Sequence, residues 1–396
     1  MMTILPAAAN QAISYPSSLN SQLLSMRLPF SCVLLLATAL RLAAAEPIKI
    51  GEFASLTGKQ ASFGQTNHRG AVFAAEEINA AGGVLGRPLE LVTEDTRSVQ
   101  GEAATAVKKL LARDKVVAVV GETSSSAALE AAPLCQAARV PMISATATNP
   151  RVTEAGDYVF RVCFIDPFQG TVLAKFARST LKARRVALLV SNGSAFSVGL
   201  SKYFRENFAA HGGEIVAEQK YAEGDKDFRA QLTAIKATNP DAIFASGDYA
   251  ESALICVQAR QLGLAIPLFG GDTWDSPALV EIGGQSVEGG FFSAHFSPDS
   301  TDPAVRNFVQ RFRTRWGASP DTGTSLGYDA VMVLADAIRR AGSTDGAKVR
   351  DALATTKGFP GVTGRITIDA QRNASKSAVI FTVKDGQFVY VESVAP

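Results

Sequence analysis

The sequence of 396 residues has few of the residues that usually build metal sites and disulfide frameworks. It has three histidines, which lie far apart, and four cysteines, none of them in a Cys-x-x-Cys pair. Isolated histidines without ligand spacing are expected at surface or capping positions, so the sequence predicts no metal and no cofactor. The three cysteines after residue 45 cannot all pair. They are expected to be buried thiols, with one disulfide possible but not required; these cysteines are Cys135, Cys163 and Cys256.

An excess of charge of one sign is also missing. Lys and Arg together number 39, and Asp and Glu number 37. Two of the arginines lie in the first 45 residues, which contain no acid, so the rest of the chain is balanced at 37 of each. Proteins whose main partner is a nucleic acid or an anionic membrane need a surplus of Lys and Arg. The balance argues against both partners and favours a small ligand.

The N-terminal segment indicates export. Arg27 precedes an apolar run from Leu28 to Leu40, and the small residues 43–45 follow, which is the order of a secretory signal with its cleavage site. The run is too short to span a bilayer as a mature helix. Residues 1–25 carry no charge, so Met26 is a plausible true start. We therefore expect residues 1–45 to be removed and the mature chain to lie outside the cytoplasm without membrane insertion.

After residue 45, short β-branched runs alternate with segments of helical periodicity. Strands are predicted at 48–53, 89–95, 116–121 and 141–144, and helices at 67–81, 101–113 and 127–138. The pattern starts again after Tyr158, with strands at 185–190, 215–221, 242–246 and 267–270. Such alternation predicts an α/β fold with parallel sheets in two similar blocks. Two long helices at 305–316 and 325–341 follow, and Asp385-Gly386 predicts a hairpin near the C-terminus.

Polar residues follow several of the predicted strands, where open parallel sheets bind ligands. The first group is Gly121 to Ser126, which places three serines at the start of a helix. Unpaired N–H groups and the helix dipole can bind a carboxylate or phosphate there, although ordinary N-capping is the simpler interpretation. Thr146 and Thr148 follow the next strand and could be turn residues, and Asp272 follows a strand of the second block, where a cap is its default role.

Aromatic residues occupy comparable strand-to-helix positions in both blocks. These residues are Phe63, Phe196 and Tyr249. Each could be an ordinary core residue, but their shared topology favours the wall of a cleft. The sequence contains no convincing motif for catalysis or phosphate binding. Gly51 to Lys59 has the wrong spacing for a phosphate loop, and no Gly-x-Ser-x-Gly elbow is accompanied by a suitable histidine.

Together, residues 77–88, 121–126, 142–150 and Gly327-Tyr328-Asp329-Ala330 resemble the leucine/isoleucine/valine-type substrate-binding proteins of ABC transporters. The resemblance extends from Glu46 to Pro396. It implies the type I periplasmic-binding-protein fold, with two Rossmann-like lobes joined by three crossovers. The lobes expected from it are 46–166 with 296–376, and 167–295 with 377–396. It also implies a periplasmic location, an amino-acid ligand, and a membrane permease as partner.

The resemblance assigns roles to the candidate residues. Ser125 and the Thr148 amide would bind the ligand carboxylate, whereas the Thr146 carbonyl, the Thr148 hydroxyl and Asp272 would bind its ammonium. Phe63, Phe196 and Tyr249 would line the side-chain pocket, which suggests an apolar amino acid. Two alternatives stay open: a sensor of an amide, urea or aromatic acid on the same fold, and an α/β hydrolase that uses the loop 124–126.

Overall fold

The computed structural model describes residues 46–121 and 123–396, so the expected signal sequence lies outside the described residues. No helix in the described ranges combines the length and the apolar character needed to cross a membrane.

The first lobe is built on a sheet of five parallel strands in the order β2-β1-β3-β4-β5. Most of its strand residues are buried, as expected for a parallel sheet covered on both faces. The order reverses beside β1, which is where doubly wound sheets bind ligands. The strands are β1 (Ile48–Ala54), β2 (Leu89–Asp95), β3 (Ala118–Val120), β4 (Met142–Ser144) and β5 (Val159–Arg161).

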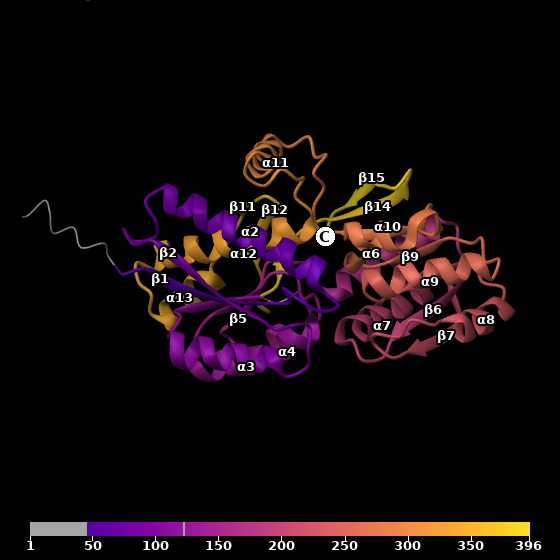
Figure 1. Ribbon diagram of the computed structural model, residues 1–396, viewed down its shortest axis with the longest axis horizontal. Helices are drawn as coiled ribbons and strands as arrows, with labels where there is room; N and C mark the ends of the chain where they lie inside the picture. Colours follow the sequence, from indigo (N-terminus) through magenta and orange to yellow (C-terminus); the bar gives the residue numbers. More distant parts are fainter. Residues whose placement is uncertain (1–45, 122) are drawn as a thin grey trace, which may run out of the picture. The chain divides into compact units, whose positions relative to one another are not determined.

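Helices from both ends of the chain cover this sheet (Figure 1). One apolar core joins strand residues of the sheet to α2 and to three helices from the C-terminal third of the chain. A second core joins other strand residues of the same sheet to α3 and α4. The helices are α2 (Ala61–Ala80), α3 (Glu102–Lys109), α4 (Ser125–Ala138), α5 (Arg151–Glu154), α11 (Pro303–Trp316), α12 (Thr322–Ala341) and α13 (Gly346–Ala354). A short π-helical turn, Leu110–Asp114, extends α3.

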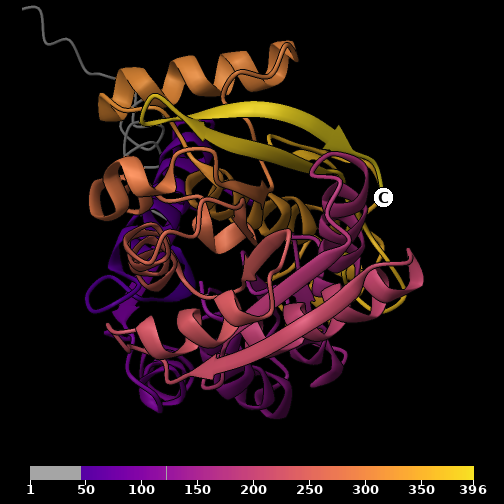
Figure 2. The ribbon, with the colours of Figure 1, turned by 90° about the vertical axis from the view of Figure 1, so that its right-hand side faces the viewer.

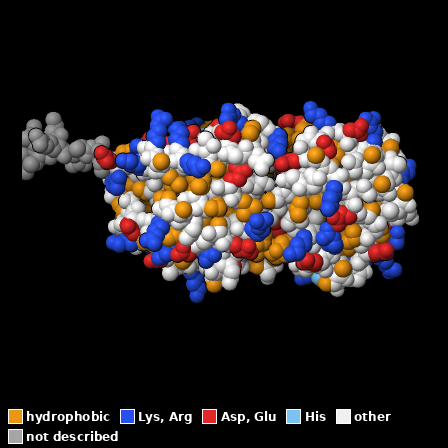
Figure 3. Space-filling view, turned by 90° about the horizontal axis from the view of Figure 1, so that it is seen from below, with side chains coloured by type: hydrophobic (Ala, Val, Ile, Leu, Met, Phe, Trp, Pro, Cys, Tyr) orange, Lys and Arg blue, Asp and Glu red, His pale blue; other side chains and the backbone are white. Residues whose placement is uncertain are grey.

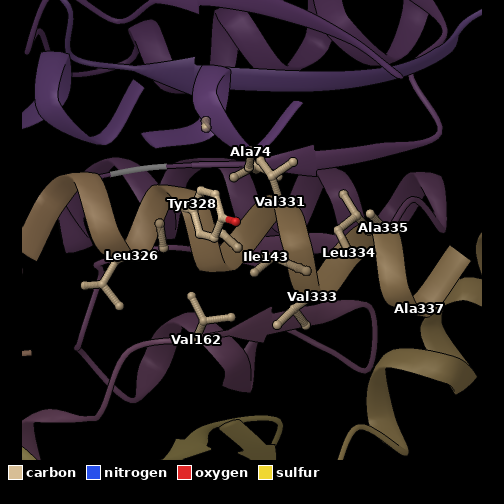
Figure 4. Packing of buried hydrophobic residues seen from close by; sticks show 14 of the residues in the cluster. Ala74, Ile143, Val162, Leu326, Tyr328, Val331, Val333, Leu334, Ala335 and Ala337 are labelled. Atoms are coloured by element: carbon tan, nitrogen blue, oxygen red, sulfur yellow. The ribbon is translucent and has the colours of Figure 1, made fainter. Parts of the chain in front are cut away.

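Helix α12 is buried along most of its length and is apolar on more than one side, as its sequence requires of a core helix. In Figure 4, Val331 lies beside Ala74 of α2, and Val333 lies near Val162. Two glycines let the backbones of α2 and α12 approach closely. A Cβ on Gly70 would lie 1.9 Å from the carbonyl oxygen of Thr324, and one on Gly327 would lie 2.2 Å from that of Asn67.

The second lobe is built on a seven-stranded sheet in the order β15-β14-β10-β9-β8-β6-β7. The five strands from β10 to β7 are parallel, and β14 and β15 are antiparallel to their neighbours. Figure 2, which faces this lobe, shows the β14–β15 hairpin at the edge opposite β7. The strands are β6 (Arg185–Ser191), β7 (Glu214–Tyr221), β8 (Ala242–Ala245), β9 (Leu268–Gly270), β10 (Phe291–Ala294), β14 (Ala378–Lys384) and β15 (Gln387–Val394).

The predicted hairpin is confirmed, with positive φ angles of 52° at Asp385 and 70° at Gly386. Such left-handed pairs match the twist of the flanking strands. The helices of this lobe are α6 (Asp166–Ser179), α7 (Ala195–Ala210), α8 (Arg229–Ala237), α9 (Tyr249–Gln261) and α10 (Pro277–Gly283).

The chain passes between the two sheets three times: from β5 to α6, from β10 to α11, and from β13 to β14. Before the last passage it forms a small antiparallel sheet of β11 (Phe359–Gly361), β12 (Gly364–Ile368) and β13 (Ala374–Ser375). The predicted α/β fold with two parallel-sheet lobes and three connections is confirmed.

Cys135, Cys163 and Cys256 are free and buried, as expected of thiols that serve as small apolar residues. Burial raises the pKa of each to about 12, so the reactive thiolate is suppressed. On the face shown in Figure 3, basic and acidic side chains are interspersed. This distribution agrees with the balanced charge of the sequence.

Candidate ligand-binding site

A small cavity lies between the two lobes, at the carboxyl ends of strands from both sheets. Its volume is about 20 Å³, roughly the space of one water molecule. Five of the seven residues predicted from the sequence line it: Phe63, Ser125, Thr146, Phe196 and Asp272. A larger groove of about 340 Å³ shares Gln60 and Ser124 with the cavity. An amino acid exceeds the cavity, so its binding requires the walls to move apart.

On the first lobe, the cavity is bounded by the start of α4 and the loop after β4. Ser124 is the N-cap of α4 and accepts a hydrogen bond from the Ala127 amide at 3.5 Å. The Ser125 hydroxyl is buried and accepts from the Asn149 amide at 3.3 Å, which joins the two loops. Thr146, which follows β4, is also buried in the lining. This wall therefore presents hydroxyls at the positive end of a helix dipole.

On the second lobe, Asp272 begins a 3₁₀ turn directly after β9. The residue is only 3% exposed, and its carboxylate accepts hydrogen bonds from Gln169 Nε2 at 2.7 Å and from His295 Nε2 at 2.9 Å. Gln169 belongs to α6 of the second lobe, and His295 follows β10 of the same lobe. A carboxylate can accept further bonds, so Asp272 can still bind a donor from the cavity.

Asp248 supplies a second acid to the lining, which the sequence reasoning missed. It follows β8 as Asp272 follows β9, so its position after a strand was the available signal. Its carboxylate accepts from Gln60 Nε2 of the first lobe at 2.7 Å. Burial raises its pKa to about 6, although the Gln60 hydrogen bond opposes the shift. The other lining residues that were missed are Gln60, Ser194 and Thr273, whereas Thr123 and Ser124 belong to the group predicted at Gly121 to Ser126.

Two predicted site residues lie outside the lining of this cavity. Thr148 is buried, and its carbonyl accepts from the Asp166 amide at 3.0 Å. Tyr249 is mostly buried, and its hydroxyl donates to the Lys59 carbonyl at 2.9 Å. Ligand contacts by Thr148 and Tyr249 remain predictions.

The histidines are placed differently from one another. His68 bonds to the buried Glu52 at 2.6 Å, and His211 is the C-cap residue of α7. His295, by contrast, is buried beside Asp272, so the expectation of a surface or capping position was wrong for it. Its sequence surroundings gave no signal, because its partner is 23 residues away.

Several hydrogen bonds and one ion pair connect the lobes around the cavity. Lys59 pairs with Glu223 at 2.8 Å, and the hydroxyls of Ser62 and Ser276 are 3.0 Å apart. Near the start of α7, the Ala195 amide donates to Ser126 Oγ at 3.1 Å, and its carbonyl accepts from Asn149 Nδ2 at 2.7 Å. These contacts depend on the lobes being close together.

Replacing Lys59 by methionine is expected to weaken ligand binding by no more than about fivefold. The Lys59 side chain is 41% exposed, and exposed ion pairs contribute about 0.2–1 kcal/mol. Calorimetric dissociation constants at low salt and at 1 M NaCl would measure the effect, which should shrink as salt screens the pair. The exposed Lys175→Met variant of α6 is the control, and a salt-independent loss would contradict this role.

Two parallel-sheet lobes joined by three connections, with a polar cavity between their sheet ends, define a two-lobed solute-binding protein. The chain belongs to the periplasmic binding protein family, whose sequence model matches residues 47–387. The family resemblance seen in the sequence is thus confirmed.

The chain is similar to several proteins and solved structures of this family. A Leu/Ile/Val-binding protein homologue of Brucella melitensis is 31% identical, over 88% of this chain and 95% of its own length. The leucine-binding protein LivK of Thermotoga maritima is 41% identical with a TM-score of 0.86, over 88% of this chain and 99% of that one. LivJ of Streptococcus pneumoniae, in complex with isoleucine, is 35% identical with a TM-score of 0.84, over 89% and 100%.

Proposed function

We propose that this protein captures an amino acid between its lobes in the periplasm and delivers it to the permease of an ABC importer. The observation that carries the proposal is that hydrogen-bond donors face the cavity from one lobe and a carboxylate faces it from the other. Ser125 and the start of α4 face the cavity from the first lobe, and Asp272 faces it from the second. These walls suit the two charged ends of a zwitterion.

The carboxylate of the amino acid would bind at the start of α4. There the Ser125 hydroxyl can donate a hydrogen bond, and free N–H groups of the first helical turn carry partial positive charge. Thr148 would contribute its amide, as the resemblance implies. A fixed cation is not needed for this end of the ligand, and within the described residues no Lys or Arg lines the cavity.

The ammonium group would bind to Asp272, with the Thr146 carbonyl and the Thr148 hydroxyl as further acceptors. Charge-assisted hydrogen bonds of this kind are about twice as strong as neutral ones. Asp248 adds negative potential at the same cavity, so a ligand with a cationic group is favoured. A plain aromatic acid would add a further anion to a lining that already holds two acids, which disfavours the aromatic-acid alternative.

The side chain would lie against Phe63 and Phe196, with Tyr249 nearby, which favours an apolar amino acid. Phe63 comes from α2 of the first lobe but packs in the apolar core of the second lobe. Closure would therefore bury the ligand side chain between aromatic groups of both lobes. The names of LivK and LivJ, and the isoleucine complex of LivJ, support an aliphatic side chain.

Binding would proceed by hinge motion, without breaking a bond in the ligand. We propose lobes of 46–166 with 296–376 and of 167–295 with 377–396, which rotate about the three connections. Opening would admit the amino acid, and closure would exclude water and strengthen its charged hydrogen bonds. A serine hydrolase of the Ser-His type requires a histidine beside Ser124–Ser126, and among the described lining residues there is no histidine.

A thermal-shift screen of the twenty L-amino acids, followed by calorimetry, tests the proposal. A ligand present at 100 times its dissociation constant stabilises the folded protein by about 2.7 kcal/mol. We expect leucine, isoleucine or valine to give the largest shift. Absence of any shift, or consumption of the amino acid detected by mass spectrometry, would contradict the proposed function.

The Ser125→Ala variant is expected to lower the affinity for the best amino acid by at least tenfold. The change removes a hydrogen bond to a charged carboxylate, which contributes about 1.5–3 kcal/mol. Calorimetry would measure the loss, with Ser179→Ala as the control, since that hydroxyl is exposed at the end of α6. Equal affinities of the Ser125→Ala variant and the wild type would remove Ser125 from the site.

A further inference from the structure

Asp272 is held by a buried set of hydrogen-bond donors that come from the segments connecting the lobes. We infer that Gln169 and His295 are positioning residues, which orient the Asp272 carboxylate toward the ligand ammonium and link it to the hinge. The inference rests on the proposed function, because it deepens the role of Asp272 in that site. It assigns a role to two residues that do not line the ligand cavity.

His295 is suited to hold a carboxylate without cancelling its charge. Its Nε2 lies 2.9 Å from Asp272 Oδ2, and its ring stacks on Phe164 with centroids 3.5 Å apart and planes 20° apart. Burial lowers its pKa to about 4, despite the opposing effect of Asp272, so the imidazole is neutral at pH 7. Since a carboxylate only accepts, Nε2 must carry the hydrogen. The negative charge of Asp272 is therefore left for the ligand.

Gln169 holds the other carboxylate oxygen. Its Nε2 donates to Asp272 Oδ1 at 2.7 Å and to Ser293 Oγ at 2.8 Å, and the side chain is fully buried. Ser293 belongs to β10, so Gln169 joins α6, β10 and the turn after β9. Both oxygens of Asp272 thus have a neutral donor, which fixes the orientation of the carboxylate plane.

The two donors lie where the chain passes between the lobes. Gln169 is in the first turn of α6, just after the connection from β5, and His295 directly follows β10 at the start of the second connection. Phe164, which stacks on His295, belongs to the first connection. A hinge rotation changes the backbone at these segments, so the position of Asp272 is coupled to the angle between the lobes.

The alternative is that these residues only stabilise the fold, and the two roles predict different ligand responses. If these residues position Asp272, substituting them should weaken only the binding of the ligand ammonium, because Asp272 faces that end of the ligand. If they only stabilise the fold, substituting them should weaken all contacts between the ligand and the cavity to the same extent. The comparison of L-leucine with 4-methylpentanoate separates them, since the latter keeps the carboxylate and the side chain but lacks the ammonium.

The experiment measures calorimetric dissociation constants of both compounds for the wild type and for His295→Phe and Gln169→Leu. We expect each variant to lose about tenfold in affinity for L-leucine and less than twofold for 4-methylpentanoate. His295→Gln, whose amide can replace the Nε2 donor, should restore most of the preference for leucine. His211→Phe, at the exposed end of α7, is the control.

If a variant lost the same affinity for L-leucine as for 4-methylpentanoate, so that the ratio of the two dissociation constants stayed that of the wild type, the inference would be overturned. If the thermal-shift screen identifies an amino acid other than leucine as the best ligand, the experiment uses that amino acid and its own deaminated acid. A wild type that binds amino acids without preferring them over the deaminated acid would contradict this inference but leave lobe closure on a carboxylate intact. A wild type that binds no amino acid would refute the proposed function itself. Should His295→Phe fail to fold, Gln169→Leu and Gln169→Met test the loss of the ratio, and His295→Gln should still keep most of the preference for leucine.

Discussion

Replacement of Asp272 by alanine should reduce the affinity for the amino-acid ligand by roughly 30- to 700-fold. Removing one partner of a buried, hydrogen-bonded charge pair costs about 2–4 kcal/mol, because the other charge stays buried without compensation. Here the uncompensated group would be the ligand ammonium, enclosed between the lobes. Gln169 and His295 would also lose their shared acceptor. The loss should therefore exceed that of Ser125→Ala.

Calorimetry with the best amino acid, at constant salt, would measure this change. Glu281→Ala is the matched control, because it removes an exposed acid of the same lobe on α10. The Asp272→Asn variant keeps the shape but not the charge, and should lose most of the affinity as well. If Asp272→Ala bound the amino acid as tightly as the wild type, the ammonium site would have to lie elsewhere, and the amide or urea alternative would regain support.

The second large effect is on stability: Asp329→Ala is expected to lower the free energy of unfolding by about 3–5 kcal/mol. Asp329 is fully buried in α12 and accepts from the Val362 and Thr363 amides at 2.8 and 2.9 Å and from the Thr363 hydroxyl at 2.5 Å. The buried Lys376 bonds to the same hydroxyl. Burial lowers the pKa of Lys376 to about 8, and Asp329 opposes that shift.

The stability loss follows because the alanine variant would leave the Lys376 ammonium buried without its acid. Denaturant unfolding would measure it. Asp336→Ala is the control on the same helix, since Asp336 forms a partly exposed pair with Arg340, and it should change the free energy by less than about 0.5 kcal/mol. A small effect at Asp329 would mean that Lys376 is hydrated or neutral in the folded protein.

The resemblance motif at Gly327-Tyr328-Asp329-Ala330 now has a physical explanation. Gly327 allows the close approach of α2, and the Tyr328 hydroxyl donates to Glu77 of that helix at 2.7 Å. Asp329 joins α12 to the loop between β11 and β12. The motif is thus structural, whereas the loops at Ser125 and Asp272 form the candidate site.

The sequence was sufficient for the regular elements that have clear periodicity or turn residues. The early strands, the core helices and the Asp385-Gly386 hairpin agree with the structure to within a few residues, although α2 begins six residues earlier than predicted. Strands β5 and β10 and helix α6 were not predicted. The two strands have three and four residues, too few to display a period of two. Helix α6 begins with Asp166-Pro167, a helix-start signal that the sequence reasoning missed.

By itself, the sequence determined the alternation of strands and helices, the balance of charge and the polar residues that follow each strand. Those features depend on neighbours along the chain, and with the family resemblance they were enough to predict the fold and five lining residues. Only the tertiary structure decided which side chains share the cavity. It placed Asp248 and Gln60 there from the two lobes, left Thr148 and Tyr249 out of the lining, and paired the buried His295 with Asp272. Contacts such as Gln60 to Asp248 join residues 188 positions apart, and periodicity carries no information over that distance.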